Sequence, residues 1–317
     1  MANDKVKKPK PEVDLLAIMQ RFGSDEQCRA YLEMLRWPDG VCCLRCKADK
    51  ISRIQTRASF ECASCGYQFS VKAGTIFHDS HLPLTKWFLA VYLMCEAKKG
   101  VSAMQLKRTL GVAYKTAWYL CHRIRAAVAD ADAAPLSETV EVDETFIGGK
   151  AKNMHKADRE RKITGRGTVN KAMALAIIQR GGAVRLKLAS QRDRETLHAF
   201  IRGNATPETA RIMTDEWTAY QGIGDADTKH ETVNHCQDEY VRGDVHTNTV
   251  EGVFSLFKRS IVGAFHQIST KHLDRYLDEF EFRFNNRNNP YLFRDALLCL
   301  ITSDNLEYKE LTKKEAA

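Results

Sequence analysis

Two pairs of cysteines constrain the fold of this chain more than any other feature of its sequence. Cys43 and Cys46 form one Cys-x-x-Cys pair, and fifteen residues separate it from a second pair, Cys62 and Cys65. Four thiolates on two tight turns at this spacing can surround Zn²⁺ as a tetrahedron, with a short β-ribbon between the turns. Cys42 is a rival ligand, but only Cys43 keeps the two-residue gap to Cys46. The alternative, four buried or redox-active thiols, rarely shows this spacing in a reducing compartment, so the sequence predicts a structural zinc ribbon.

The composition indicates a folded protein of roughly two domains with a polyanionic partner. The chain has 317 residues, 44% of them hydrophobic, and a formal net charge of +8 with a pI near 8.9, which favours nucleic acid. No apolar run reaches the length of a membrane span, and the basic residues 1–10 are followed by no hydrophobic signal-peptide core. We therefore expect a cytoplasmic, nucleoid-associated protein with no membrane partner.

Helical patterns flank the cysteines. Apolar residues between 13 and 36 recur at helical spacing with a break at Gly23-Ser24, which predicts two short helices. Between 101 and 125, Ser102 can cap a helix and Gly111 can form the turn before a second helix, the pattern of a helix-turn-helix. In that arrangement Tyr114, Lys115 and Thr116 face the DNA groove, although a plain helical hairpin has the same pattern.

The stretch from Thr139 to Lys150 predicts a strand that carries carboxylates and then turns sharply at Gly148-Gly149. Asp143 lies in this strand, and Lys150 begins a loop rich in lysine and arginine that extends to residue 171. Mg²⁺ takes one or two protein carboxylates and completes its shell with water and substrate phosphate. A carboxylate strand beside a cationic loop is therefore a candidate metal and phosphate site, although such a charge run is as often a solvated face.

The following segments predict a ribonuclease H-like order of elements. Strands at 173–179 and 183–189 are joined by a hairpin at Gly181-Gly182, a helix covers 195–201, and a buried strand at 211–215 ends on Asp215. Acids are thus expected at the ends of the first and fourth strands of this α/β pattern.

A third acid lies on a helix near residue 250. Val250, Phe254, Phe257 and Ile261 recur at helical spacing and form its apolar face. The neighbouring face carries four polar residues: Asn248, Glu251, Ser255 and Lys258. We expect the apolar face to pack on the sheet, which holds Glu251 near the strand ends and places a cation two turns away.

At this point the chain resembles a known family. Its motifs are similar to those of the ISXO-two-like insertion-sequence transposases (insertion-sequence family 1595) from about residue 12 to residue 290. The motifs concerned are Trp37-Pro38-Asp39-Gly40, the cysteine pairs, Asp143-Glu144-Thr145-Phe146-Ile147-Gly148-Gly149-Lys150, Thr214-Asp215, His246-Thr247-Asn248, Glu251 and Lys258-Arg259.

The resemblance implies a DDE-type transposase. In this reading Asp143, Asp215 and Glu251 bind two Mg²⁺ (or Mn²⁺) ions, and Lys258 is the basic residue that follows the glutamate. Asn248 is a rival third ligand, but the charge of Glu251 suits Mg²⁺ better and its spacing to Lys258 fits.

The implied reaction is metal-dependent phosphoryl transfer, in which transposon ends are cleaved and joined to target DNA. The partner is double-stranded DNA, contacted also by Lys150 and Arg259, and joining two ends requires at least a dimer. Two other functions remain open: a DNA-binding regulator with an inert ribonuclease H-like domain, and a nuclease without strand transfer.

The expected architecture is a multidomain α+β protein, with helices, zinc ribbon and helix-turn-helix preceding a ribonuclease H-like α/β catalytic domain. The predicted parts are an N-terminal helical segment (12–38), the zinc ribbon (39–78), the helix-turn-helix region (79–130), a linker (131–137), the catalytic domain (138–300) and a tail (301–317).

Overall fold

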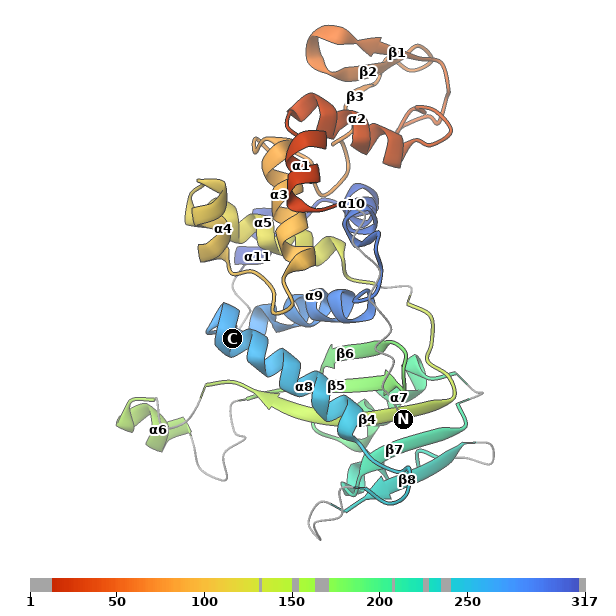
Figure 1. Cartoon of the computed structure of the whole chain (residues 1–317), viewed down its shortest axis with the longest axis vertical. Coiled ribbons are helices and arrows are strands. Elements are labelled where there is room, and N and C mark those ends of the chain that lie inside the picture. The colour runs from red at the N-terminus through yellow and green to blue at the C-terminus, as the bar shows by residue number, and fades with distance from the viewer. Residues whose placement is uncertain are drawn as a thin grey trace. The chain divides into compact units, whose positions relative to one another are not determined.

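The structure is a computed structural model that describes residues 13–130, 133–149, 154–162, 171–206, 209–224, 228–234 and 241–313. The chain divides into two compact units, labelled by element in Figure 1. Residues 1–129 and 288–317 form the helical unit, and residues 130–287 form the sheet unit. None of the described helices is long and apolar enough to cross a membrane.

The helical unit begins with the two helices that the sequence predicts. Helix α1 spans Leu15–Arg21 and helix α2 spans Asp25–Arg36. Between them, the Ser24 hydroxyl accepts a hydrogen bond from the Gln27 N–H while the Gln27 side chain accepts one from the Ser24 N–H. This reciprocal capping satisfies two backbone donors at the start of α2 and explains the break.

The zinc-ribbon segment forms a small antiparallel sheet. Strands β1 (Ile51–Ile54), β2 (Ser59–Cys62) and β3 (Gln68–Phe69) pair in sequence order, with a 3₁₀ turn at Gln55–Arg57. The Trp37 ring lies edge-on to Phe60 and Phe69, with centroids 5.5 and 6.0 Å away. These aromatic contacts join the ribbon to the end of α2.

Three further helices complete the N-terminal part of this unit. They are α3 (Leu84–Glu96), α4 (Ala103–Leu110) and α5 (Tyr114–Ala127). Ser102 accepts a hydrogen bond from the Gln105 N–H and caps α4, and Gly111 ends it with a φ of +61°. Glycine adopts this left-handed conformation without the Cβ penalty, so both predicted boundaries of the helix-turn-helix pattern are present.

The end of the chain returns to the helical unit. Helix α10 (Leu292–Thr302) packs on α2 and α3, and the Phe293 ring lies 5.9 Å from both Phe22 and Phe88. Helix α11 (Tyr308–Thr312) follows, with Leu311 buried. The sheet unit thus ends at residue 287, before the boundary at 300 expected for a catalytic domain, and the described part of the expected tail (301–317) includes packed residues, because the apolar face of α10 completes a helical core.

The sheet unit contains five strands in the order β6-β5-β4-β7-β8. Their bounds are β4 Thr139–Ile147, β5 Ala172–Gln179, β6 Val184–Leu188, β7 Arg211–Asp215 and β8 Lys229–Val233. The first three pair antiparallel, whereas β7 runs parallel to both β4 and β8. This mixed sheet confirms the expected α+β fold with a ribonuclease H-like domain.

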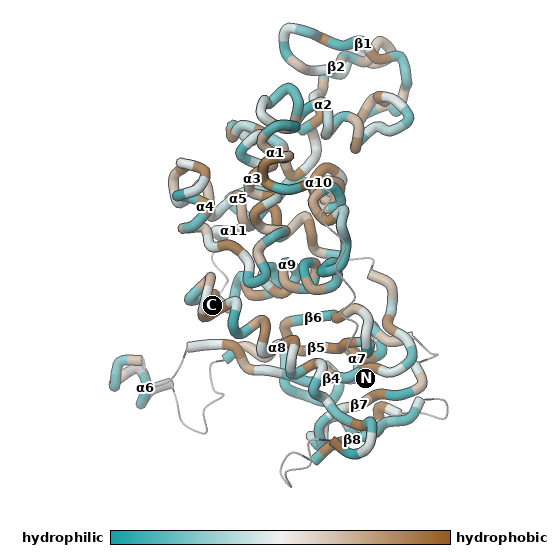
Figure 2. Tube along the Cα trace, in the orientation of Figure 1, coloured by the Kyte–Doolittle hydropathy of each residue, from teal (hydrophilic) through white to brown (hydrophobic). Residues whose placement is uncertain are grey.

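Helices cover both faces of the sheet. Helix α7 (Arg194–Asn204) packs on one face, and α8 (Asn248–Ser260) and α9 (Leu273–Asn285) pack on the other (Figure 1). Strand β5 is apolar on both faces, as its brown colour in Figure 2 shows. Its small residues Ala174 and Ala176 lie with Ile178 under the side chains of α8 and α9, whereas Met173, Leu175 and Ile177 face α7.

Two segments differ from the sequence-based expectation, and three short helical segments were not predicted. The basic segment 150–171, expected as a loop, contains helix α6 (Lys156–Lys162). Leu136, in the expected linker, is buried and bonds backbone-to-backbone with Asn204 and Thr206. A π-helical segment, Ile261–Phe265, continues from α8, and short 3₁₀ turns occur at Thr218–Tyr220 and Thr270–His272.

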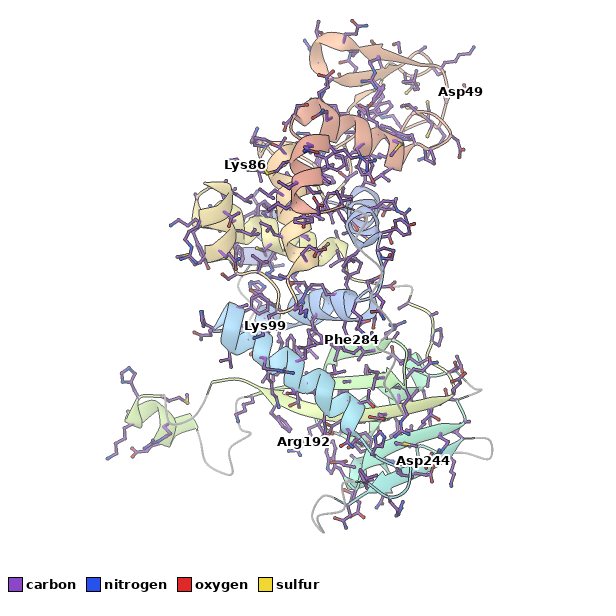
Figure 3. The ribbon with its side chains drawn as sticks, in the orientation of Figure 1. Asp49, Lys86, Lys99, Arg192, Asp244 and Phe284 are labelled. Atoms are coloured by element: carbon purple, nitrogen blue, oxygen red, sulfur yellow. The ribbon has the colours of Figure 1, made fainter. Side chains whose placement is uncertain are left out.

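The edge strand β6 is held by polar side chains of α9. The backbone N–H groups of Val184, Leu186 and Leu188 donate to the side chains of Asn285 (2.8 Å), Glu281 (2.7 Å) and Asp274 (3.1 Å). Alternate residues of β6 thus find acceptors on one face of α9, the helix that carries the labelled Phe284 in Figure 3. This pairing covers a row of donors that an edge strand otherwise exposes.

Candidate active site

A cavity of about 610 Å³ in the sheet unit lies between strand β4 and helix α8. Its lining residues are Asp143, Glu144, Thr145, Glu251, Phe254, Ser255, Lys258, Arg259 and Val262. Three of the four polar residues on the predicted face of α8, namely Glu251, Ser255 and Lys258, therefore face the same space as Asp143. The cavity combines carboxylates at one end of α8 with cations further along it.

Asp143 lies in an environment that opposes its negative charge. Burial, followed by the charge of Glu144, raises the pKa of the Asp143 carboxyl from 3.8 to about 8. The Glu144 N–H, which donates to Asp143 Oδ1 at 2.8 Å, acts in the opposite direction, whereas the charges of Asp215 and Glu251 raise the pKa further. Four carboxylates from two strands and one helix thus act on one another.

Asp215 ends strand β7, the parallel neighbour of β4. Its Oδ1 accepts a hydrogen bond of 3.0 Å from the Trp217 N–H, which fixes the side chain at the end of the strand. Asp215 is not among the residues that line the cavity, but its charge contributes to the raised pKa of Asp143. The carboxylates of Asp143, Asp215 and Glu251 do not all lie within 4.8 Å of one another.

The two candidates for the third acid position differ in placement. Glu251 lines the cavity and accepts a hydrogen bond of 3.3 Å from the Thr247 hydroxyl. Asn248 begins α8, is exposed and does not line the cavity. The structure thus brings Glu251, and not Asn248, to the space beside Asp143.

Glu144 is a residue that sequence reasoning did not select. Strand alternation turns it toward the α7 face, where the buried Tyr220 hydroxyl donates to its Oε2 at 2.7 Å. Burial raises the pKa of Glu144 as well, with a smaller contribution from Asp215. Only its position next to Asp143 in the sequence could have indicated that the Glu144 carboxylate lies close to the Asp143 carboxylate.

Two other residues near the site also lacked a sequence signal. The Arg192 guanidinium, labelled in Figure 3, lies over the rings of Phe146 and Trp217, 4.9 and 4.8 Å from their centroids. Val262, in the π-helical segment, lines the cavity although its side chain is 74% exposed. Arg192 and Val262 lie in segments that only the tertiary fold brings close to β4, so their position could not be predicted from the sequence.

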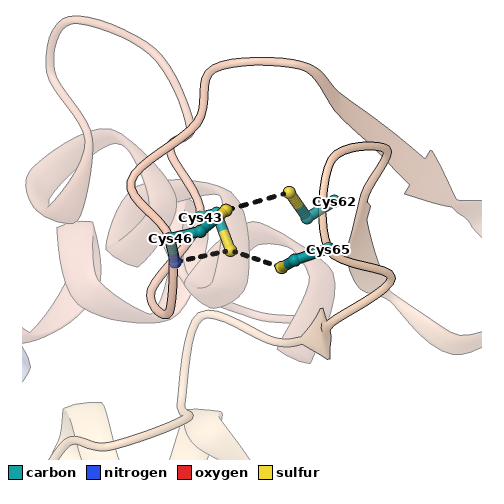
Figure 4. A group of neighbouring side chains, drawn as sticks. All are labelled: Cys43, Cys46, Cys62 and Cys65. Atoms are coloured by element: carbon teal, nitrogen blue, oxygen red, sulfur yellow. Dashed lines mark hydrogen bonds between the residues drawn. The ribbon is translucent and has the colours of Figure 1, made fainter.

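The four ribbon cysteines converge as predicted. Figure 4 shows their sulfur atoms pointing toward one another, with Cys43 Sγ 3.6 Å from Cys65 Sγ and Cys46 Sγ 3.5 Å from Cys62 Sγ. All four ligand atoms lie within 4.8 Å of one another. Tetrahedral Zn²⁺ with Zn–S bonds of about 2.3 Å needs sulfur separations of about 3.8 Å, so the geometry fits a closed structural zinc site.

Backbone amides favour the thiolate form at this cluster. Burial acts to raise the pKa of Cys43, but the N–H groups of Cys46 and Arg45, 3.5 and 3.4 Å from its Sγ, outweigh burial and lower the pKa to about 6. The thiolate is the form that binds metal. The pattern is that of a zinc knuckle, in which the turn itself donates to the ligand sulfur.

The predicted DNA-facing residues of α5 are exposed at its first turn. They are Tyr114, Lys115 and Thr116. The Lys115 ammonium lies 4.4 Å from the centroid of the Tyr308 ring, so α11 contacts this helix. Lys150 lies outside the described residues, and Arg259 lines the cavity of the sheet unit.

Comparison with known proteins identifies the family. A family model described as the ISXO2-like transposase domain matches residues 135–285, and one described as the transposase zinc-ribbon domain matches residues 23–68. An uncharacterized protein in transposable element ISH50 of Halobacterium salinarum is 30% identical over 275 residues, which cover 84% of this chain and 92% of the relative.

One solved structure gives only a remote match. A chain of the simian T-cell lymphotropic virus intasome in complex with PP2A regulatory subunit B56 gamma has a TM-score of 0.28 and 13% identity, over 56% of this chain and 63% of that chain. This similarity is too low to carry a structural argument. The two domain matches and the relative in ISH50 agree with the cysteine cluster and the mixed sheet, and the chain belongs to the ISXO2-like transposases, with an N-terminal transposase zinc ribbon.

Proposed function

We propose that this protein catalyses DNA transposition by cleaving the ends of an insertion sequence and joining them to target DNA. The observation that supports this proposal is the position of Asp143 and Glu251 in one cavity, with Asp215 at the end of the neighbouring strand β7 and within electrostatic reach of Asp143. The cavity that contains two of these acids also contains Lys258 and Arg259. Carboxylates beside cations suit a site that holds metal ions against the phosphodiester backbone.

The chemistry of the three acids fits two Mg²⁺ or Mn²⁺ ions, which would be held by Asp143, Asp215 and Glu251. Carboxylate oxygens are the ligands that these hard ions prefer, and a cation would relieve the repulsion that raises the pKa of Asp143. When bound, such a pair of ions activates a water as the nucleophile and stabilises the departing 3′ oxygen.

Two other cavity residues are proposed to contact the DNA. Lys258 and Arg259 neutralise backbone phosphates, which positions the scissile bond without reading sequence. The half-buried position of Asp143 limits competing water, and a low local dielectric strengthens the interaction of the carboxylates with any bound cation. Sequence recognition is assigned to helices α4 and α5, through Tyr114, Lys115 and Thr116, with Lys150 as a further phosphate contact. Because transposition joins two ends, the active form contains at least two chains.

The test uses the zinc-loaded full-length protein, labelled DNA that contains both ends of its element, a target plasmid and Mg²⁺. We expect cleavage and joining by the wild type, and loss of both in Asp143→Ala, Asp215→Ala and Glu251→Ala with end binding retained. Asn248→Ala should keep most activity, which distinguishes the two candidates for the third acid. Asp278→Asn is a matched control, because Asp278 is a half-buried acid of the same unit outside the cavity.

The two rival functions predict different results in the same assay. If the wild type binds the ends without metal-dependent cleavage, the protein is a DNA-binding regulator. If the wild type cuts the ends but never joins them to the plasmid, it is a nuclease. Equal activity of Asp143→Ala and wild type would contradict the proposed active site.

A further inference from the structure

The carboxylate of Glu141 is completely buried and faces helix α8. It lies two residues before Asp143 on β4, so both side chains point to the same face of the strand. Its Oε2 accepts hydrogen bonds from the backbone N–H groups of Thr249 (2.8 Å) and Val250 (3.1 Å). Its Oε1 accepts from the Thr249 hydroxyl (2.8 Å) and from Arg180 Nε (2.7 Å).

These contacts cap α8 from a different element. The first N–H groups of a helix have no acceptor within the helix, and a side chain at the N-cap position usually binds the second or third of them. At the N-cap position of α8, the Thr247 hydroxyl donates to Glu251 and does not cap the helix. Glu141 takes over this task, and its negative charge also interacts favourably with the N-terminal end of the helix dipole.

The loop before α8 is fixed to the same carboxylate. Arg180, which pairs with Glu141, donates to the backbone carbonyls of Asp244 (2.7 Å) and His246 (3.1 Å). The His246 Nδ1 also lies 3.3 Å from Glu141 Oε1. A buried carboxylate is costly unless charge-assisted hydrogen bonds compensate for the lost hydration. Here the hydrogen-bond donors to Glu141 come from Arg180, next to the end of β5, and from Thr249 and Val250 at the start of α8.

The distances along the chain make Glu141 a direct link between the two acids. Asp143 is two residues away on β4, roughly 7 Å along the strand. Glu251 is one to two residues beyond the capped N–H groups, roughly 1.5–3 Å along the helix axis. A shift at the cap therefore reaches Glu251 almost undiminished, and shifts above about 0.5 Å are enough to disturb a functional site.

We infer that Glu141 is a positioning residue that sets the place of α8 on β4 and thereby the separation of Asp143 and Glu251. It is not itself a metal ligand, because both of its oxygens already accept hydrogen bonds from protein donors. The inference rests on the proposed function, namely that Asp143 and Glu251 hold a divalent cation together. Glu141, the first of the three acids of β4 (Glu141, Asp143 and Glu144), would thus position α8, whereas Asp143 would bind the metal.

The test measures Mn²⁺ binding by the zinc-loaded full-length protein, from the loss of the free Mn²⁺ signal in electron paramagnetic resonance. Glu141→Gln replaces one acceptor with an NH₂ group that faces the N–H groups of α8. We expect about a 10- to 100-fold loss of Mn²⁺ affinity, the usual range for residues that orient metal ligands. Zinc content and binding of transposon ends should not change.

A matched control separates positioning from general stability. Glu281→Gln removes another partly buried carboxylate of the sheet unit, which accepts the Leu186 N–H and lies 3.5 Å from Arg185. This variant should keep wild-type Mn²⁺ affinity even where its stability falls as far as that of Glu141→Gln. If both variants lose Mn²⁺ affinity equally, or if Glu141→Gln binds within twofold of wild type, the inference is wrong.

A milder pair of variants decides the question if Glu141→Gln does not fold. Thr249→Val removes the hydroxyl that donates to Glu141, and Thr249→Ser keeps it. We expect weaker Mn²⁺ binding in the first and recovery in the second, and equal binding in both would reject the inference. Failure of the proposed function looks different, because the wild type would then bind Mn²⁺ no better than Asp143→Ala.

Discussion

Asp143 is a residue at which binding and folding make opposite demands. Its carboxylate is half-buried beside Glu144 and within electrostatic reach of Asp215 and Glu251, so its charged form is disfavoured. A site that brings carboxylates together to bind cations also brings their negative charges close to one another. Without a cation, the repulsion between these charges destabilises the folded protein. Residues of this kind lower stability while they serve function.

The first prediction follows from this conflict. The pKa of Asp143 is raised from 3.8 to about 8, so the folded state loses stability as the pH rises through this range. Asp143→Asn removes the charge at similar volume, and it should raise the free energy of unfolding at pH 8 by about 1–3 kcal/mol in buffer without Mg²⁺. Urea unfolding of both proteins measures this, together with loss of cleavage activity.

The control variant for this prediction should change the free energy of unfolding in the opposite direction. Asp244 pairs with Arg211, and their hydrogen bond holds the pKa of Asp244 down at about 2. Asp244→Asn should therefore lower stability at pH 8. If Asp143→Asn is less stable than wild type at pH 8, the negative charge of Asp143 is stabilised in the folded protein and the prediction is wrong.

At the scale of single residues, the sequence predicts those whose position follows from the regular spacing of a strand or a helix. Asp143 and Asp215 are predicted as site residues because each lies on a recognisable strand, and Glu251 because it shares a helical face with Lys258. The roles of Glu141 and Glu144 were not predictable, because they depend on contacts with Thr249 and Tyr220 more than seventy residues away. Spacing along one element carries no information about such partners.

At the scale of elements, helix α9 combines packing with protection of a strand edge. Leu273, Leu277 and Phe280 pack on the sheet, and the adjoining polar face accepts hydrogen bonds from β6. The helical period predicted α9, but it could not show that the acids would meet backbone N–H groups. That outcome depends on which strand forms the edge of the sheet.

The second prediction concerns an acid on this face. Burial, followed by the charge of Asp274, raises the pKa of Asp278 from 3.8 to about 6. An acid with a raised folded-state pKa favours folding below its unfolded pKa, and this contribution is lost as the pH rises through 6. Asp278→Asn should therefore match wild type near pH 4 and exceed its stability by about 1–2 kcal/mol at pH 8. Urea midpoints between pH 4 and 8 measure the difference.

Asp274→Asn is a suitable comparison for this experiment. Asp274→Asn relieves its repulsion with Asp278 but weakens the acceptor of the Leu188 N–H at 3.1 Å, so it should give a smaller gain at pH 8 than Asp278→Asn. If wild type and Asp278→Asn show parallel stability curves over the whole pH range, the raised pKa is wrong.

The third prediction concerns the zinc ribbon. Small sheets of this kind depend on metal for stability, and Trp37 packs on Phe60 and Phe69 of the ribbon. Removal of zinc by a chelator should shift tryptophan emission to longer wavelength as Trp37 becomes hydrated. Trp37→Phe should abolish most of this shift, and Cys46→Ser should show the metal-free spectrum without chelator. An unchanged spectrum after complete loss of zinc would contradict a structural metal site.

At the scale of the whole molecule, the sheet unit is a continuous segment inserted into the helical unit. The chain leaves the helical unit after α5 and returns to it with α10. Leu297 and Leu300 of α10 are completely buried, so the returning segment is part of the core. The apolar pattern of α10 is visible in the sequence, but the pattern does not show which of two cores will receive it.

The fourth prediction tests this division. Phe293 is buried among aromatic residues of the helical unit, and Phe293→Ala should destabilise that unit by about 3–5 kcal/mol. Hydrogen exchange should then accelerate in α2 and α3, with little change in β4 and β5. Tyr291→Ala is the control, because Tyr291 is exposed and its loss should have a small effect. Equal acceleration in β5 would show that the two units unfold together.

The insertion also sets an order for synthesis. A ribosome completes the whole acid-bearing segment before it releases α10, so the helices proposed to read DNA remain without part of their core until α10 emerges. A messenger truncated near codon 287 would encode every acid of the cavity but leave Phe22 and Phe88 without the Phe293 ring that packs on them. Only a chain translated through α10 can therefore have both units fully packed, which ties the assembly of the helical unit to the synthesis of a segment that follows the whole sheet unit.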